Sequence, residues 1–122
     1  MKALVVTLIS VLASSSFASL AHIYDCGSLK MQGQTQVGKN TYSVEIANGE
    51  IGKSVFLTTT IPGSQTAPKT ERLLNNANMY SQAKGDLDVV ISERSDGFVN
   101  VQIVKSTNPN IRAQCALKVS GQ

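Results

Sequence analysis

The sequence predicts an all-β fold: a small antiparallel barrel or sandwich of about six to seven strands with one end-to-end disulfide. Three observations lead to this prediction. Apolar and polar residues alternate with a period of two in several stretches, most clearly in the last third of the chain. Turn signals separate these stretches, and no strand–helix–strand rhythm is present. The only two cysteines stand near the two ends of the chain. The alternation does not separate a barrel from a sandwich, because both bury one face of every strand.

The chain begins with the pattern of a secretory signal peptide. Lys2 supplies a positive charge, an apolar run covers Ala3 to Ala13, and Ser16-Phe17-Ala18 has the small–x–small spacing of a cleavage site. We therefore expect residues 1–18 to be removed. Ser19-Leu20-Ala21 offers a second cleavage site, and a buried N-terminal helix, which would lack a capping residue and a polar face, is the alternative.

The remaining residues, 19–122, are expected to form a single β domain with a modest core. The N-terminal apolar run is shorter than the roughly 20 residues of a membrane-spanning helix, so we expect no stable membrane span. Export through the signal peptide predicts a periplasmic or extracellular location. The formal net charge of the whole chain is +3, and its Lys and Arg residues are scattered. Without clustered cations and stacking aromatics, we do not expect nucleic acid as a partner.

Two cysteines in an exported chain most often pair with each other. A bond between Cys26 and Cys115 would remove about 4.5 kcal/mol of unfolded-state entropy in the chain-entropy model. It also requires the first strand, around Ile23–Leu29, to lie beside or across from the last one. Free thiols and a metal pair are the alternatives. No Cys-x-x-Cys spacing exists, and the one histidine, His22, stands near the expected mature end, so no metal site is predicted.

The first clear hairpin lies in the middle of the chain. Apolar Tyr42, Val44 and Ile46 alternate with polar residues, and Asn48-Gly49 follows as a strong hairpin signal. A two-residue turn there predicts the pairs Ile46–Ile51, Tyr42–Val55 and Val44–Lys53. The next strand runs to Ile61, after which Pro62-Gly63 stops it.

Two stretches lack a clear strand pattern. Residues 31–40 indicate a wide loop or a loosely held edge strand. Residues 64–84 indicate a loop with at most two helical turns, with Thr70 as N-cap, because asparagines disfavour a longer helix. A strand around Asn78–Ala83 is the alternative. Long loops on rigid β scaffolds often bind partners, so we predict a binding surface here. Its candidate residues are Thr66, Lys69, Arg72, Asn75, Asn76 and Tyr80.

The last third, Asp86 to Val119, indicates two consecutive hairpins. A slip of one residue would turn every side chain to the other face, so loop length and hydrophobic parity must agree. They agree for a three-residue loop, Ser95-Asp96-Gly97, with Gly97 in the left-handed conformation, and for a second loop at Thr107-Asn108-Pro109. The predicted pairs are Ile91–Val101, Val89–Ile103, Ile103–Ala113 and Val101–Cys115.

No residue set with the chemistry of catalysis can be named. Asp86 and Asp88 would share one strand face, which ordinary solvation explains beside inward-facing Leu87 and Val89. No Ser, Thr or Cys stands in a nucleophile motif with a base. Gly52-Lys53-Ser54 lacks the earlier glycine of a phosphate loop. We therefore predict a protein with no catalytic residues, no cofactor and no metal.

The aromatic side chains offer a further binding hypothesis. If Phe56 and Phe98 share an exposed face, that patch would be the best candidate for binding. The chain contains no Trp, the residue that carbohydrate-binding surfaces often use.

The plan of a short exported β domain with cysteines near both ends resembles the periplasmic lysozyme inhibitors of the barrel type. The resemblance covers architecture alone. The Ser/Gly-rich inhibitory loop of that family, with its following Arg-Tyr, is not present. The most similar stretch of this sequence, Gly63-Ser64-Gln65-Thr66, does not match it.

We expect a non-enzymatic exported domain that binds a protein or ligand in the cell envelope or outside. One alternative is a structural component that assembles with copies of itself. A second is a periplasmic enzyme inhibitor of the lysozyme-inhibitor barrel shape. The oligomeric state does not follow from the sequence.

Overall fold

The chain folds into antiparallel β-strands, with no helix among the residues that the structure describes. A computed structural model describes residues 21–32, 34–49 and 52–118, so the predicted signal peptide, residues 1–18, lies outside the described residues. The strands are β1 (Ala21–Gly27), β2 (Lys30–Met31), β3 (Thr35–Gln36), β4 (Thr41–Gly49), β5 (Gly52–Thr60), β6 (Lys69–Arg72), β7 (Leu74–Asn76), β8 (Met79–Ser81), β9 (Leu87–Glu93), β10 (Val99–Lys105) and β11 (Asn108–Leu117).

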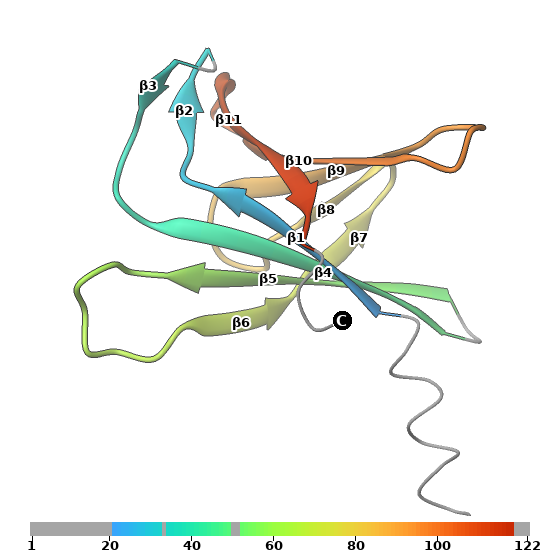
Figure 1. The fold of residues 1–122 in the computed structure, drawn as a ribbon, viewed down its shortest axis with the longest axis horizontal. Coiled ribbons are helices and arrows are strands. Elements are labelled where there is room, and N and C mark those ends of the chain that lie inside the picture. Colours follow the sequence, from blue (N-terminus) through green and yellow to red (C-terminus); the bar gives the residue numbers. More distant parts are fainter. Residues whose placement is uncertain (1–20, 33, 50–51, 119–122) are drawn as a thin grey trace, which may run out of the picture.

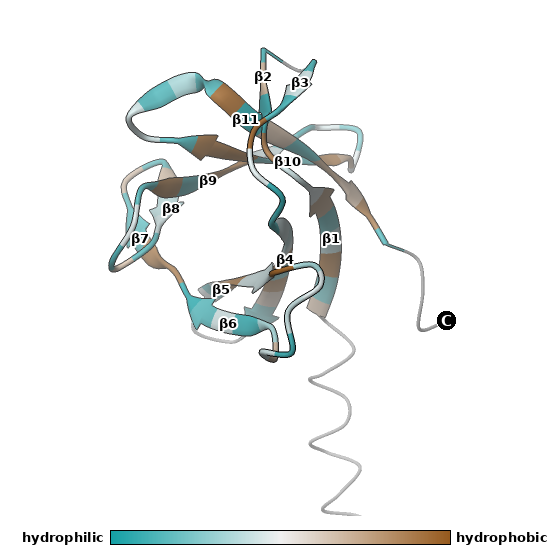
Figure 2. Ribbon diagram, turned by 90° about the vertical axis from the view of Figure 1, so that its left-hand side faces the viewer, coloured by the Kyte–Doolittle hydropathy of each residue, from teal (hydrophilic) through white to brown (hydrophobic). Residues whose placement is uncertain are grey.

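The strands form one sheet that curls into a nearly closed barrel. Their order is β6-β5-β4-β1-β11-β10-β9-β8-β7, and the short hairpin β2–β3 attaches to β11 at the side. Figure 2 shows the strands around a ring, with β6 next to β7, and Figure 1 shows the barrel from the side. The predicted all-β antiparallel fold is confirmed. The expected six to seven strands were too few, because five of the eleven strands have only two to four residues.

The barrel closes where β6 runs directly into β7. Leu73 makes this corner: its backbone N–H donates to the carbonyl of Val55 at 2.8 Å, and its side chain is 4% exposed. Nearby, the Gln82 Nε2 donates to Glu71 Oε2 at 2.9 Å, which ties the β8–β9 connection to β6. The two edge strands are therefore joined by chain continuity and by side-chain hydrogen bonding.

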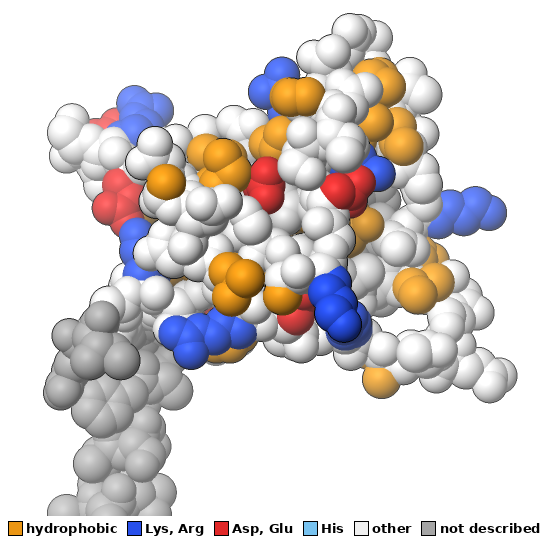
Figure 3. Space-filling model, turned by 180° about the vertical axis from the view of Figure 1, so that it is seen from behind, with side chains coloured by type: hydrophobic (Ala, Val, Ile, Leu, Met, Phe, Trp, Pro, Cys, Tyr) orange, Lys and Arg blue, Asp and Glu red, His pale blue; other side chains and the backbone are white. Residues whose placement is uncertain are grey.

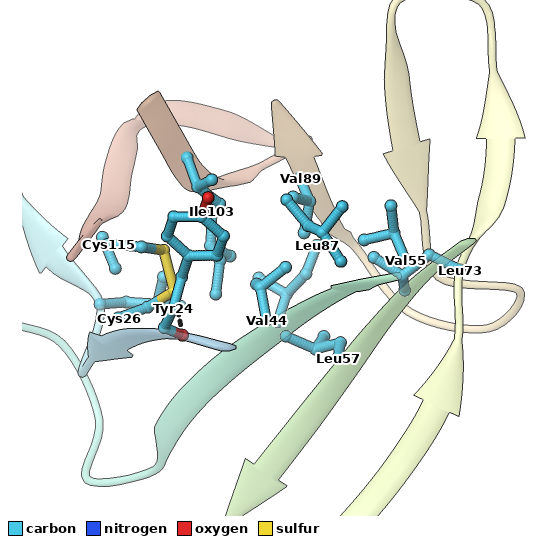
Figure 4. Close-up of a cluster of buried hydrophobic side chains, with 14 residues drawn as sticks. Tyr24, Cys26, Val44, Val55, Leu57, Leu73, Leu87, Val89, Ile103 and Cys115 are labelled. Atoms are coloured by element: carbon cyan, nitrogen blue, oxygen red, sulfur yellow. Dashed lines mark hydrogen bonds between the residues drawn. A yellow bond between two sulfur atoms is a disulfide. The ribbon is translucent and has the colours of Figure 1, made fainter. Parts of the chain in front are cut away.

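Alternate residues of the long strands fill the ring. Figure 4 shows apolar side chains from opposite walls meeting in one cluster. Full burial of such a side chain stabilises the fold by about 1.5–3 kcal/mol. Leu87 and Val89 face inward, as predicted. The buried residues are Tyr24, Cys26, Leu29, Val44, Ile46, Val55, Leu57, Leu73, Leu87, Val89, Val101, Ile103, Ala113 and Cys115.

The predicted disulfide between Cys26 and Cys115 is present and links residues 89 positions apart (Figure 4). It joins β1 to β11, whose own register has two pairs, Tyr24–Leu117 and Asp25–Ala116. The prediction that the first strand lies beside the last is thereby confirmed. The disulfide strengthens the junction between the β1–β4–β5–β6 half of the sheet and the β7–β11 half.

The predicted registers of the last third are confirmed. All four predicted pairs occur, and Gly97 has a φ of 93° in the predicted three-residue loop. The bounds of the second predicted loop are wrong: Asn108 and Pro109, expected in the loop with Thr107, belong to β11, and the chain turns at Ser106-Thr107. The register shifts between Val104 and Lys105, so a bulge accommodates this proline, which has no N–H to donate.

The predicted register of the β4–β5 hairpin is wrong by four residues. The observed pairs are Tyr42–Thr59, Val44–Leu57 and Ile46–Val55, and the chain reverses between Gly49 and Gly52. Ile51, the predicted partner of Ile46, lies outside the described residues. The observed register sets buried Val44 opposite buried Leu57, where the predicted one set it opposite Lys53. A shift of four keeps the parity, so the predicted inward faces of Val44 and Val55 are correct.

The helical turns predicted within residues 64–84 are absent. Thr70, the expected N-cap, lies in β6, and its hydroxyl is 2.8 Å from the Thr58 hydroxyl of β5. Pairing with neighbouring strands has overridden the local helix signal. The strand alternative around Asn78–Ala83 is correct for Met79–Ser81. In residues 31–40, the structure has the edge hairpin of β2 and β3.

Candidate functional site

One end of the barrel carries a cleft of about 650 Å³. It lies between the tip of the β9–β10 hairpin and the neighbouring ends of β1, β4, β5 and β11. Figure 1 shows the β9–β10 tip and the β4–β5 turn at the same end of the molecule. Buried Tyr24 and Ile46 line the cleft from the core side. We call this cleft, with Phe98 and Leu117 at its edge, the barrel mouth.

Two large apolar side chains at the barrel mouth are exposed to solvent. Phe98 is 68% exposed and Leu117 is 51% exposed, and both line the same cleft. They come from different hairpins, and Leu117 reaches the cleft because β11 ends there beside Tyr24 of β1. Exposed apolar residues that gather around one concavity are typical of interaction sites, whereas single ones are not.

The conformation of the β9–β10 tip holds Phe98 in place. The Arg94 guanidinium carbon lies 5.7 Å from the centre of the Phe98 ring, a cation–π arrangement. The Arg94 N–H donates to the Phe98 carbonyl at 2.8 Å, and the Phe98 N–H donates to Asp96 Oδ1 at 3.2 Å. Arg94 also forms an ion pair with Asp96 at 2.9 Å. These contacts fix the backbone at Phe98 and place the Arg94 side chain over its ring.

A charged pair spans the barrel mouth. Lys53 of β5 donates a hydrogen bond to Glu93 of β9, and this ion pair connects the two halves of the sheet. The hydrogen bond and the charge of Lys53 hold the pKa of Glu93 below its usual value. Burial raises the pKa of Tyr24; the Lys53 charge opposes this shift and the Glu93 charge adds to it. At neutral pH the mouth therefore combines a neutral phenol with a self-compensated ion pair.

The remaining polar groups at the mouth come from β1 and β4. His22 is exposed, pairs with Ile46 across the strands, and lines the cleft together with Asn48. These groups can exchange hydrogen bonds with a bound segment. Over the described ranges, no three His, Cys, Asp or Glu side chains form a group that could hold a metal ion. The same ranges contain no helix long and apolar enough to span a membrane.

No protein-family model, no curated protein and no solved structure matches this chain. Figure 3 shows Lys and Arg side chains at several separate places on the back of the molecule, as their scatter along the sequence predicts.

The binding surface predicted in residues 64–84 is spread over three strands and a loop. Tyr80 packs against the core cluster. Asn75 and Asn76 are successive residues of β7 and so point to opposite sides of the sheet. Lys69 and Arg72 are exposed on β6, and Thr66 lies in the exposed loop before it. The structure does not bring these six side chains together on one face; their role in binding stays a prediction.

The aromatic patch proposed from Phe56 and Phe98 does not form around the described cleft. Phe56 lies on the outer side of β5, between Glu45 of β4 and Arg72 of β6. Phe98 lines the barrel mouth without it. The two aromatics therefore belong to different surfaces.

The Lys53–Glu93 pair was missed by the sequence reasoning. One signal was present: Lys53 has the parity of an inward-facing residue at the end of a strand, and Lys is almost never buried unless its charge is paired. Asp86 and Asp88, considered as a carboxylate pair, have separate surroundings. Asp86 forms an ion pair with Lys105 at 3.0 Å, while Asp88 pairs in register with Val104.

Proposed function

We propose that this protein is exported and acts, in the periplasm or outside the cell, as a non-enzymatic domain that binds a partner protein at the barrel mouth. The observation that carries the proposal is the exposed Phe98 ring, held by Arg94 beside a cleft with apolar lining. Support for export comes from the signal-peptide pattern of residues 1–18 and from the Cys26–Cys115 disulfide, which persists in oxidising compartments.

The shape of the mouth favours a protruding segment as the bound element. Its volume of about 650 Å³ falls within the range of pockets that enclose a small ligand or a few side chains. A loop that inserts an apolar side chain would cover Phe98 and Leu117 and remove their exposed surface from water. Aromatic anchors beside a pocket commonly carry most of the binding energy of an interface. Because Lys53 and Glu93 neutralise each other, the inserted side chain need not carry charge.

The test is capture of a partner by the purified, tagged, secreted protein, followed by binding measurements on the partner identified. Phe98→Ser and Leu117→Ser should each weaken binding by tenfold or more, on the scale of an aromatic hot spot. The matched control is Ile61→Ser. Ile61 is also exposed, at 49%, but follows the opposite end of β5. Equal binding by the Phe98 and Ile61 variants would overturn the assignment of the mouth.

Size-exclusion chromatography separates the alternatives. A monomer at all concentrations agrees with binding to a different protein. Assembly that grows with concentration and is lost in Phe98→Ser would make the partner a second copy of the chain, and the protein structural. If the captured partner is an enzyme that loses activity in the complex, the protein is an inhibitor.

A further inference from the structure

A second pocket, of about 500 Å³, lies on the outer surface of the barrel along β11. It is separate from the barrel mouth: the two clefts share no lining residue. Buried Cys26 and Ala113 border it from below, so the disulfide junction of β1 and β11 supports its floor. Its polar lining is Ser28, Lys30, Gln32, Gln102, Arg112 and Gln114.

Two cations face each other in this pocket. Arg112 of β11 is directly opposite Lys30 of β2, so their side chains rise from the same face of the sheet. Like charges in directly opposite positions destabilise a strand pair. None of the ion pairs found among the described residues includes either cation, and no carboxylate lines the pocket. The structure therefore maintains a local positive charge that a bound anion would compensate.

Glutamine side chains extend the pocket from the two cations. Gln114 lies two residues after Arg112 and shares its face, and Gln102 of β10 is directly opposite Gln114. The Gln114 amide donates to Asn100, which leaves its carbonyl oxygen available as an acceptor. Primary amides offer both donors and acceptors, the combination that hydroxyl groups need. No aromatic side chain lines this pocket, so recognition here would use charge and hydrogen bonds without stacking.

We propose that this pocket binds an anionic sugar. The carboxylate or phosphate of the sugar lies between Lys30 and Arg112, where charge-assisted hydrogen bonds form, and Arg112 can engage two oxygens at once. The sugar hydroxyls lie against Gln102 and Gln114. The pocket has room for a sugar ring as well as the anionic group. The proposal does not depend on the binding proposed at the barrel mouth.

Calorimetric titration of the purified protein tests the proposal with four probes: glucuronic acid, glucose 6-phosphate, glucose and inorganic phosphate. We expect at least one of the two anionic sugars to bind with a dissociation constant in the millimolar range, and more weakly as salt is added. Glucose and phosphate should each bind at least tenfold more weakly than that sugar. The two anionic probes distinguish a carboxylate from a phosphate as the recognised group.

Variants assign the binding to this pocket. Arg112→Gln should weaken binding of the anionic sugar by about tenfold, the scale of one lost charge-assisted contact. Lys30→Gln provides a second test if the first variant folds poorly. The matched control is Lys84→Gln, which removes the same charge from an exposed position between β8 and β9 and should leave the affinity unchanged.

Several results would overturn the proposal. If glucose binds as tightly as the anionic sugars, the two cations take no part in recognition. If inorganic phosphate binds equally tightly, the sugar takes no part in it. If neither anionic sugar binds at a concentration of tens of millimolar, the pocket is not a site for anionic sugars. Phe98→Ser should bind the sugar like the wild type, so failure at this pocket and failure at the barrel mouth are distinguishable.

Discussion

Gln82 organises the connection between β8 and β9 through both its backbone and its side chain. Its N–H donates to the Leu87 carbonyl at 3.2 Å, and its Oε1 accepts from the Leu87 N–H at 3.0 Å. Its Nε2 reaches Glu71 at the closure of the barrel. Gly85 makes room for this arrangement: it has a φ of 132°, and a Cβ at this position would lie 2.3 Å from Gln82 Oε1.

Gly85→Ala should destabilise the protein by about 2 kcal/mol or more, because strained backbone and a steric clash add. Gln82→Ala should cost about 1–2 kcal/mol through lost hydrogen bonds. The double variant should be less destabilised than the sum, since removal of Gln82 also removes the clash. Urea unfolding of all four proteins measures this coupling. Strict additivity would show that the two residues act independently.

Ala77 adopts a backbone conformation that favours glycine. Its φ is 56°, in the two-residue turn between paired Asn76 and Met79. Ala77→Gly should raise the free energy of unfolding by about 0.5–1 kcal/mol, because relief of strain exceeds the added entropy of the unfolded chain. Thermal unfolding provides the measurement. Ala83→Gly is the control: Ala83 lies outside the positive-φ positions, so its replacement should lower stability slightly.

At the scale of the strands, prediction succeeded where two independent signals agreed. In the last third, hydrophobic parity and loop chemistry both required Ser95-Asp96-Gly97 as the loop. For the β4–β5 hairpin, the Asn48-Gly49 signal competed with the hydrophobic pattern, and the pairing of buried Val44 with Leu57 prevailed. Local turn preference is worth little against the burial of two core side chains.

The β6–β8 region could not be predicted because its strands are only three or four residues long. Such short segments show no periodicity, and their conformation is decided by the edges that they join. Tyr80, for example, is fixed by pairing with Val89 of β9. The six expected binding residues were read as one segment, but a strand corner at Leu73 separates them.

Val101 tests the assignment of the central strand. It is 0% exposed and lies in β10, opposite Ile91 on one side and Cys115 on the other. Val101→Asp should prevent folding, because it places a carboxylate in the core without a partner. The control is Gln102→Asp, which changes the neighbouring residue on the outer face and should leave a folded protein. Circular dichroism and proton NMR report the outcome; a native spectrum for Val101→Asp would contradict the facing of β10.

At the scale of the whole molecule, the barrel mouth shows why the site escaped sequence reasoning. Lys53 and Glu93 are 40 positions apart, and the strands that carry them are not neighbours in the sheet. Only closure of the barrel brings them together. Likewise, Phe98 and Leu117 belong to separate hairpins, and their common cleft depends on where β11 ends.

The Lys53–Glu93 pair should make stability depend on pH. The folded-state pKa of Glu93 is lowered from 4.5. The stability that Glu93 adds to the folded protein is therefore present above pH 4.5 and is lost as the pH falls through the lower, folded-state pKa. Glu93→Gln should therefore lose less stability than the wild type between neutral and acidic pH. Urea unfolding at pH 7 and pH 3 compares them. The difference in lost stability between the two proteins should shrink in 1 M salt, because salt screens the ion pair. Equal losses of stability at low salt would contradict a stabilising role of the Lys53–Glu93 pair.

Tyr24 should act at the other end of the pH scale. Its folded-state pKa is raised above 10.0. The stability that the neutral phenol adds to the folded protein is therefore complete below pH 10.0 and is lost as the pH rises through the raised, folded-state pKa. As the pH rises above 9, the melting temperature of Tyr24→Phe should fall less than that of the wild type. Thermal unfolding as a function of pH is the measurement. An unchanged alkaline slope would show that the phenol of Tyr24 ionises freely in the folded state.

The disulfide joins the two halves of the sheet at a short strand pairing. The β1–β11 register has two residue pairs, whereas β4–β5 has nine. Loss of the Cys26–Cys115 bond should therefore release the junction and restore the entropy of the unfolded chain, at a cost of about 4.5 kcal/mol. Cys26→Ser, Cys115→Ser and the double variant should be destabilised alike, and wild type in reductant should match them.

Because β1 supplies Tyr24 to the mouth and β11 supplies Leu117, capture of a partner should weaken in the same variants. Unchanged melting temperatures under oxidising conditions would mean that strand pairing alone holds the barrel together.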